Sequence, residues 1–471
     1  TNAMAAIVTN KFRLNNAEQF YESFSEASTS YYLFVGRPQA FSASTGGGTD
    51  SVPPTPIDNV VDEYMYYRDM IAAKKIAASD RTYAIPRHDW ATGTVYDFYR
   101  GDYGATVNGS VVQTVGGITD PFATTTKMFV RSSAGNVYKC MWNNSGGASN
   151  TEPTGTSTSE YTIGADGYVW KYMFTHTTTE TTNFLTTDFM AVHTDATVSA
   201  AAVDGAVNRY VIANAGAGYT NGTYATQTLR GDGSSATFTV VVNGGSVQSV
   251  TGVAVGTGYT FADCNIDNIS GIGTPSTSAV IVPIIGPKGG HGYNAMEELG
   301  GFYVMTNTSI AGTAGSGDFV VDQDFRRIGV VRDPFDFGTT TICTADTRQA
   351  LKNVTFSGTP GVFTNDEVIT GGTSGAKGIV VDFDATTKIL KYIQTEWTGV
   401  KTTAGATQQD LVAFAASEII TGADSGATGT VSTVNNPEIE YYSGDSIYVE
   451  NRAPITRASD QTENIKLIIE F

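Results

Sequence analysis

The sequence predicts a mixed, β-dominated α+β protein of several domains. An α/β host fold near the two termini is expected to carry inserted antiparallel β modules, small barrels or sandwiches. The chain has 471 residues, enough for about three domains of roughly 150 residues each. Its 52 glycines, 24 tyrosines and 23 phenylalanines are typical of a strand-rich, turn-rich protein. Two internal duplications of strand-like segments are the third indication.

The charge of the chain argues against several classes of function. Lys and Arg number 28 against 46 Asp and Glu, which gives a net charge of −18. A protein that coats nucleic acid or an anionic membrane needs a basic surface, so neither partner is expected. The sequence has no run of about 18 apolar residues and predicts no membrane span. Its first residues lack the pattern of a secretion signal.

The first hundred residues predict mixed α and β structure. Residues 6–8 predict a short strand, and Asn16, with Gln19 three positions later, predicts the start of a helix. The aromatic run 31–35 predicts a strand. Asp58 predicts the start of a second helix. The apolar positions of one face of that second helix are Val60, Tyr64, Tyr67 and Ile71.

Strands and turns dominate the remainder of the chain. Residues 138–142 and 168–174 predict strands on either side of a polar, glycine-rich loop at 143–155. Only one further short helix is expected, at 294–299. The first duplication is Gly-Ala-Gly-Tyr-Thr at 216–220, repeated as Gly-Thr-Gly-Tyr-Thr at 256–260.

A hairpin is predicted between the two copies of this first repeat. Residues 236–242 and 246–255 alternate as strands do, and Asn243-Gly244 is a typical hairpin turn. Together with the repeat, this hairpin indicates an inserted β module.

The second duplication is longer. Residues 367–380 recur at 418–431 with nine of fourteen positions identical, and each copy predicts a strand, a glycine turn and a strand. We expect the matched glycines to supply positive φ angles where the chain reverses. We also expect residues 352–432 to protrude and to be replaceable by a short linker. The matched glycines are Gly371 and Gly422, Gly375 and Gly426, and Gly378 and Gly429.

These patterns give a map of five segments. The predicted segments are the N-terminal part of the core (1–197), an inserted β module with the Gly-Tyr-Thr repeat (198–284), a return to the core (285–349), the duplicated hairpin module (350–433) and C-terminal strands of the core (434–471).

Candidate chemical motifs are few, and each has a simpler structural interpretation. Residues 286–292 contain four glycines and a lysine but lack the order of a phosphate-binding loop, so they predict a tight connection. The Arg-Gly-Asp tripeptides at 100–102 and 230–232 predict turns. His88 adjoins Asp89 but has no visible nucleophile. No cofactor or metal is expected, and the well-separated cysteines predict buried thiols: Cys140, Cys264 and Cys343.

The C-terminal residues predict two further strands, at 446–450 and 464–471. We expect Arg452, in their connection, to pair with a nearby carboxylate, with Asp460 as the first candidate. The alternative is a solvated arginine. Ile469 and Phe471 are expected to be buried.

Five motifs occur in order near the two ends of the chain, at 6–13, 85–90, 166–174, 443–455 and 460–465. Together they resemble the baseplate wedge subunit of large contractile-tailed bacteriophages, the gene product eight family. The resemblance covers roughly 1–195 and 434–471, with a weaker match near 285–310. The two β modules have no counterpart in the familiar member of this family, so nothing about them follows from the resemblance.

The resemblance implies a structural, non-enzymatic virion protein of the tail baseplate, assembled in the host cytoplasm. It implies a homodimer that contacts other wedge subunits around the tail hub. It brings no catalytic residues and no cofactor. The motif positions to which it assigns a structural or interface role are Lys11, Phe12, Arg13, Arg87, Asp89, Trp90, Asp166, Trp170, Glu450, Asn451, Arg452 and Asp460.

Two other functions remain open at this point. The duplicated β modules and the many tyrosines are compatible with a tail-associated receptor- or glycan-binding protein. The many carboxylates are compatible with a tail-associated hydrolase, because a glycosidase needs only a pair of them.

Overall fold

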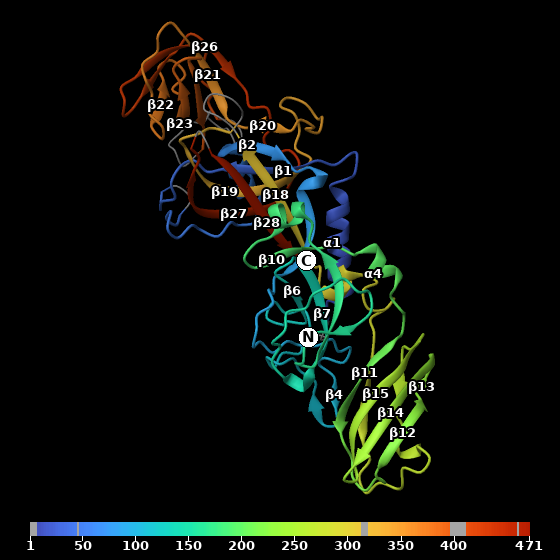
Figure 1. The fold of residues 1–471 in the computed structure, drawn as a ribbon. Helices are drawn as coiled ribbons and strands as arrows, with labels where there is room; N and C mark the ends of the chain where they lie inside the picture. The colour runs from blue at the N-terminus through green and yellow to red at the C-terminus, as the bar shows by residue number, and fades with distance from the viewer. Residues whose placement is uncertain (1–6, 45–46, 312–318, 396–410, 459–460) are drawn as a thin grey trace, which may run out of the picture. The chain divides into compact units, whose positions relative to one another are not determined.

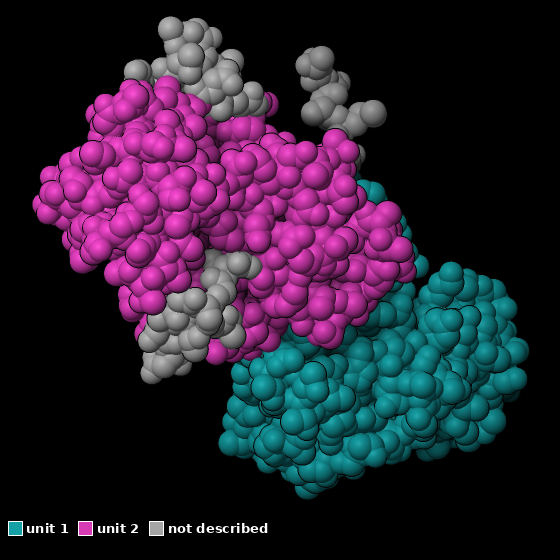
Figure 2. Space-filling model, turned by 90° about the horizontal axis from the view of Figure 1, so that it is seen from above, with its two compact units in different colours: residues 1–19, 82–305, 468–471 teal, residues 20–81, 306–467 magenta. Residues whose placement is uncertain are grey.

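The computed structural model describes residues 7–44, 47–311, 319–395, 411–458 and 461–471. The chain forms two compact units, which Figure 2 colours separately. Strands far outnumber helices in both, which confirms the predicted β-dominated α+β class (Figure 1). Unit 1 comprises residues 1–19, 82–305 and 468–471, and unit 2 comprises residues 20–81 and 306–467.

The central sheet of unit 2 has five antiparallel strands in the order β20-β2-β1-β19-β27. Its middle strand, β1, is the strand predicted at 31–35, and all six of its residues are buried. Leu33 lies opposite Val330 of β19 on one side and Lys74 of β2 on the other. The strands are β1 (Tyr31–Gly36), β2 (Met70–Lys75), β19 (Asp324–Arg332), β20 (Thr347–Gln349) and β27 (Asp445–Thr456).

The first helix begins earlier than the sequence predicts. α1 (Asn10–Ser23) includes Asn16 in its interior. Thr9 precedes the helix, and its hydroxyl accepts the Phe12 N–H at 3.2 Å, so the helix is already capped there. Ile7 and Val8 are not in a strand, and Ala6 lies outside the described residues.

The second helix, α2 (Val60–Arg68), is shorter than its predicted apolar stripe. It is capped by Asn59, not by Asp58, because the Asn59 side chain accepts the first free N–H groups of the helix. The predicted stripe is wrong at both ends, since Val60 is 64% exposed and Ile71 belongs to β2.

Unit 2 also contains a closed barrel of six strands, β21-β24-β23-β22-β25-β26, which confirms the predicted small barrel. β22 and β23 form the first copy of the long repeat, and β25 and β26 form the second. The copies join where β22 pairs with β25, with Thr370 opposite Thr421. The barrel strands are β21 (Lys352–Ser357), β22 (Val368–Gly371), β23 (Lys377–Asp384), β24 (Ile389–Ile393), β25 (Ile419–Gly422) and β26 (Thr428–Asn435).

Each copy of the long repeat holds the turn of the other through a buried carboxylate. Glu367 accepts the Ser425 N–H at 3.0 Å and the Ser425 hydroxyl at 2.8 Å. Glu418 accepts the Ser374 N–H and hydroxyl, both at 2.9 Å. The glutamate and serine shared by the two copies are therefore a reciprocal clamp.

The glycines of the repeat do not all serve the predicted purpose. Gly375 and Gly426 have φ near +66° and lie in the turns, as expected. Gly371 and Gly422 lie in strands without positive φ. A Cβ at Gly371 would meet the Glu418 carboxylate at 2.6 Å, so glycine is needed here because the clamp passes close to the backbone.

Because the two glutamates of the clamp have equivalent roles, we expect their substitutions to lower the stability of the barrel equally. Glu367→Ala and Glu418→Ala should each lower the unfolding free energy of the barrel by about 2–3 kcal/mol, because each leaves buried N–H groups without their charged acceptor. Urea denaturation of the two variants measures this. A loss at one position only would contradict the pseudo-symmetric role.

The outer side of β23 belongs to the main core of unit 2. Ile379 and Val381 pack in the same buried cluster as Leu33 and Ile71 of the central sheet, whereas Val380 faces the barrel interior. This alternation along one strand buries both of its faces. It argues against the expectation that residues 352–432 can be replaced by a linker without loss, because their removal would expose the shared core.

Unit 1 contains the four-stranded sheet β6-β7-β9-β8, and a second four-stranded sheet of the chain has the order β10-β3-β18-β28. β7 and β9 are the strands predicted at 138–142 and 168–174, and they pair antiparallel. Tyr138, Tyr168 and Trp170 are fully buried in one aromatic cluster. The strands are β3 (Arg81–Pro86), β6 (Phe129–Arg131), β7 (Asn136–Asn143), β8 (Tyr161–Thr162), β9 (Tyr168–Thr175), β10 (Phe189–Val192), β18 (Tyr303–Ala311) and β28 (Thr462–Glu470).

The remaining elements of unit 1 are short. A two-stranded ribbon is formed by β4 (Thr106–Val107) and β5 (Ser110–Val111). The helices are α3 (Thr178–Phe184), α4 (Ala196–Ala200) and α5 (Ala295–Leu299), of which the last confirms the helix expected at 294–299.

The Gly-Tyr-Thr segment also belongs to unit 1. The predicted hairpin is confirmed as β14 and β15, and both repeat tyrosines, Tyr219 and Tyr259, are buried in the cluster of this module. Its strands are β11 (Val207–Asn214), β12 (Gly222–Thr228), β13 (Arg230–Gly231), β14 (Ser234–Asn243), β15 (Ser246–Thr257), β16 (Ala262–Asp263) and β17 (Val280–Ile285). The module boundaries themselves stay a prediction.

The two C-terminal strands belong to different sheets, since β27 pairs with β19 and β28 is an edge strand of the sheet β10-β3-β18-β28. β27 extends to Thr456, so Arg452 lies in a strand and not in the connection. Among the described residues of this connection, the Arg457 Nε donates to Glu463 at 2.7 Å. Asp460 lies outside the described residues. Ile469 and Phe471 are only partly buried.

Candidate functional site

The N-terminal motif positions lie near the end of the chain in unit 1. The Arg13 Nε donates to the Phe471 carbonyl at 2.6 Å, and its Nη2 donates to Glu470 at 2.5 Å. Its guanidinium also lies over the Phe302 ring, 4.5 Å from the centroid. Lys11 forms an exposed ion pair of 3.5 Å with Glu297. Arg13 therefore fastens the last residues of the chain to α1.

These contacts of Arg13 predict that its substitution has a local effect at the C-terminal end of the chain. Arg13→Ala should increase amide hydrogen exchange at residues 468–471 by about tenfold, which corresponds to about 1.4 kcal/mol, because the charged hydrogen bonds and the ring contact are lost. Lys11→Ala is the matched control, and its exposed pair should contribute at most about 1 kcal/mol. Equal exchange in both variants would show that Arg13 does not hold this end.

Neighbouring motif side chains make contacts within unit 1. The Arg87 guanidinium holds Asp89 with Nη2–Oδ2 at 2.6 Å and donates to the Thr186 carbonyl at 2.7 Å. The Trp90 indole N–H donates to the Ser149 hydroxyl at 3.1 Å. These contacts fix the chain that leaves β3.

In the 166–174 motif, Asp166 stabilises a turn and Trp170 lies in the core. Asp166 accepts the N–H groups of Asn150 at 2.8 Å and Tyr168 at 3.1 Å, so it joins the long loop to the start of β9. Trp170 is fully buried, and its ring stacks on Tyr168 with centroids 5.5 Å apart.

The C-terminal motif positions lie on β27 in unit 2, an edge strand of its sheet. Glu450 accepts the Tyr448 hydroxyl at 2.9 Å. Asn451 accepts from the Arg327 Nε and donates to the Pro54 carbonyl, both at 2.9 Å. Arg452 is partly buried on the same strand. The described motif positions are thus divided between the two units, with those of β27 in unit 2 and the others in unit 1.

A buried ionic cluster in unit 1 was not predicted from the sequence. The Lys139 ammonium is fully buried and lies 2.7 Å from the Glu298 carboxylate and 3.1 Å from His291 Nδ1. It also lies over the Tyr99 ring, 4.1 Å from the centroid. The second Glu298 oxygen accepts the Gly292 N–H at 2.7 Å. In the sequence, the only sign of this cluster was a lysine within an otherwise apolar strand. Its partners, Glu298 and His291, lie far from Lys139 in the sequence.

The electrostatics of this cluster favour a charged pair beside a neutral histidine. Burial alone would raise the pKa of Glu298, but the Lys139 charge and the His291 contact lower it to about 2. Burial, reinforced by the Lys139 charge, lowers the pKa of His291 to about 4. Burial lowers the pKa of Lys139, against the attraction of Glu298.

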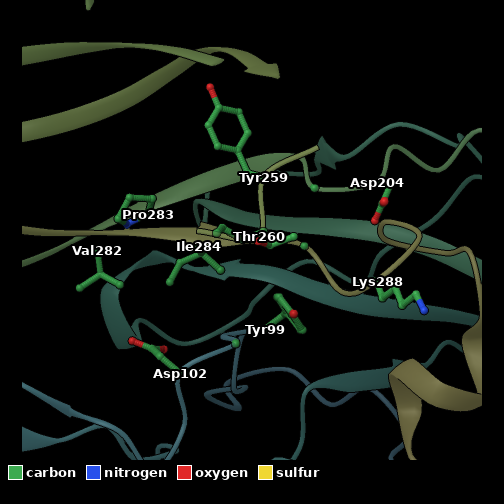
Figure 3. A pocket seen from close by; sticks show the side chains of 13 residues that line it. Tyr99, Asp102, Asp204, Tyr259, Thr260, Val282, Pro283, Ile284 and Lys288 are labelled. Atoms are coloured by element: carbon green, nitrogen blue, oxygen red, sulfur yellow. The ribbon is translucent and has the colours of Figure 1, made fainter. Parts of the chain in front are cut away.

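One cavity of unit 1 has a volume of about 610 Å³. Figure 3 shows Tyr99 and Tyr259 on opposite sides of it, with Asp204 and Lys288 near one end. Asp204 accepts the Gly289 N–H at 2.7 Å, and Asp102 is bound by Arg100 through two contacts of 2.8 Å. Both carboxylates thus serve local turns.

The other sequence motifs have structural roles in the described residues. A Cβ at Gly290 would meet the Val203 backbone at 2.4 Å, which confirms the tight connection at 286–292. In the second Arg-Gly-Asp tripeptide, Asp232 accepts the Thr260 and Phe261 N–H groups at 3.0 Å. The three cysteines are free and buried, as predicted.

The described ranges contain no group of three or more His, Cys, Asp and Glu side chains placed to hold a metal ion. None of their helices combines the length and apolar character needed to cross a membrane.

Comparison with known proteins agrees with the resemblance of the N-terminal motifs. Residues 6–230 match the family described as Bacteriophage T4, Gp8. A curated relative, the baseplate wedge protein gp8 of Enterobacteria phage T4, is 30% identical over 190 residues, which cover 36% of this chain and 55% of the relative. The chain thus spans about half the length of the curated relative it matches. Over residues 6–230, the chain is therefore similar to the Gp8 family of bacteriophage proteins.

Proposed function

We propose that the chain is a structural subunit of a phage contractile-tail baseplate wedge. The observation that carries this proposal is the match of residues 6–230 to the Gp8 family, together with the relative named as a baseplate wedge protein. The chain would reside in the virion at the tail baseplate and assemble there by protein–protein contacts around the tail hub, without an enzymatic activity.

The motif contacts support a scaffold role. Arg13 and Arg87 each direct a guanidinium to a carboxylate and to a backbone carbonyl of unit 1. Asn451 bridges Arg327 and the Pro54 carbonyl in unit 2. Such contacts fix the backbone of each unit and so keep its outer surface in one shape for assembly.

Co-expression with the other wedge subunits of the same phage tests the proposal. The chain should elute with them as one complex on size-exclusion chromatography, and a tail-fibre protein of that phage serves as the control partner. Antibody labelling of virions should mark the baseplate. Labelling confined to the capsid or to the fibre tips would contradict the proposal.

We further propose that the chain forms a homodimer within the wedge, as the resemblance implies, because a two-fold dimer needs only one self-complementary surface. Light scattering of the purified chain should give twice the monomer mass. A monomer at every concentration, with wedge subunits present, would exclude it.

A further inference from the structure

The strands β11 and β15 lie next to each other, and backbone hydrogen bonds join them only at the two ends, partly through residues that flank the strands. At one end the Val247 N–H donates to the Ala215 carbonyl at 2.9 Å, and at the other the Gly258 N–H donates to the Asp204 carbonyl at 2.9 Å. Between these contacts β11 pairs with β17 and β15 pairs with β14, and the two strands form no ladder with each other. Figure 1 shows them side by side in the module.

A cavity of about 380 Å³ opens beside β11 and β15 and is lined by residues of both strands. Its rim includes the exposed side chain of Val253, which is 59% exposed, whereas its inner wall is polar. The charged and amide side chains of the wall are Glu160, Lys171, Asn208, Arg209 and His291.

Three buried polar atoms of this wall have no hydrogen-bond partner among the described residues: Asn208 Oδ1, Arg209 Nε and His291 Nε2. His291 is only 6% exposed, and its Nδ1 accepts from the Lys139 ammonium, so we assign its proton to Nε2. Two N–H donors and one acceptor of the wall residues are therefore buried without a partner. Groups of this kind cost free energy unless something binds them.

The wall also carries one positive charge in excess. Arg209 is matched by Glu160 at 3.2 Å, and the buried Lys139 is matched by Glu298. Lys171 is 5% exposed and donates to the Thr158 carbonyl at 2.6 Å, but it has no carboxylate within ion-pair distance in the described part of the chain.

We propose that this cavity binds a compact oxyanion, a carboxylate or phosphate group, between Lys171, Arg209 and His291. The ammonium supplies the compensating charge, and the Arg209 Nε–H and His291 Nε2–H donate to the oxygens. The Asn208 carbonyl oxygen accepts from a protonated oxygen or a hydroxyl of the ligand. The same chemistry would suit a free small anion or a carboxylate side chain of a neighbouring subunit.

Titration calorimetry of the full chain with acetate and with inorganic phosphate, at constant ionic strength, tests the site. We expect saturable binding of at least one probe, weakened about tenfold or more by Lys171→Met and retained by Lys171→Arg. Lys288→Met, in the other cavity, is the matched control and should leave the affinity unchanged. Circular dichroism establishes that each variant is folded.

A second measurement distinguishes the two sources of the anion. If the carboxylate comes from a neighbouring subunit, Lys171→Met should also weaken co-elution with the wedge subunits, and excess probe should reproduce that loss in the unsubstituted chain. Absence of binding by both probes together with unchanged co-elution of Lys171→Met would overturn the proposal. Binding that is equal in Lys171→Met and Lys288→Met would overturn it as well.

Discussion

Replacing Glu298 by glutamine is expected to lower the unfolding free energy of unit 1 by about 3–5 kcal/mol. The change leaves the Lys139 ammonium, which is fully buried, without the carboxylate 2.7 Å away. A buried charge that has lost its partner must be desolvated without compensation, which is among the largest effects of a single substitution.

The adjacent residue of α5 supplies the control. Glu297 pairs with Lys11 at 3.5 Å at the surface, with both side chains partly exposed, so Glu297→Gln should change the unfolding free energy by less than about 1 kcal/mol. Guanidinium titrations of the two variants give the comparison. If Glu298→Gln and Glu297→Gln unfold at the same midpoint, the buried pair does not stabilise the fold.

The same cluster makes stability depend on pH. The pKa of His291 is lowered from 6.5 to about 4, and that of Glu298 from 4.5 to about 2. Both groups bind protons more weakly in the folded chain than in the unfolded one, so protons favour unfolding. Their contribution is complete above about pH 6.5, declines first through His291 and is lost through Glu298 as the pH falls towards 2. Glu298→Gln should flatten the lower part of this profile.

The strands and the barrel could be predicted because their signals are local. β7 and β9 coincide with aromatic runs, and the strand-turn-strand pattern within each long repeat is visible in a few consecutive residues. Helix ends were less certain, because Asp58 and Asn59 are adjacent capping residues and only the structure shows which one accepts the N–H groups.

The buried contacts could not be predicted, because they join residues that are distant in the sequence. Lys139 and Glu298 are 159 positions apart, and a lysine within an apolar strand does not reveal its partner. At the C-terminal connection the predicted pair of Arg452 with Asp460 stays a prediction, because Asp460 lies outside the described residues. β27 continues beyond Arg452, and Arg457 forms an ion pair with Glu463.

Replacing residues 352–432 by a short Gly/Ser linker is expected to abolish the cooperative unfolding of unit 2. The variant lacks three side chains of the shared core, each at most 2% exposed in the intact chain: Ile379, Val381 and Ile393. At about 1.5–3 kcal/mol for each buried side chain, the loss is about 5 kcal/mol or more. A whole domain is stable by only about 5–15 kcal/mol, so the remaining sheet should no longer unfold as one unit.

Two matched substitutions on β23 separate this cause from general damage to the barrel. Val381→Ala removes two methyl groups from the shared core, and Val380→Ala removes two methyl groups from the barrel interior. Both valines are fully buried. Hydrogen exchange should therefore rise in β1 and β2 for Val381→Ala, but only in barrel strands for Val380→Ala. A linker variant that melts cooperatively at the original temperature, with β1 still protected, would show that the sheet does not need the barrel.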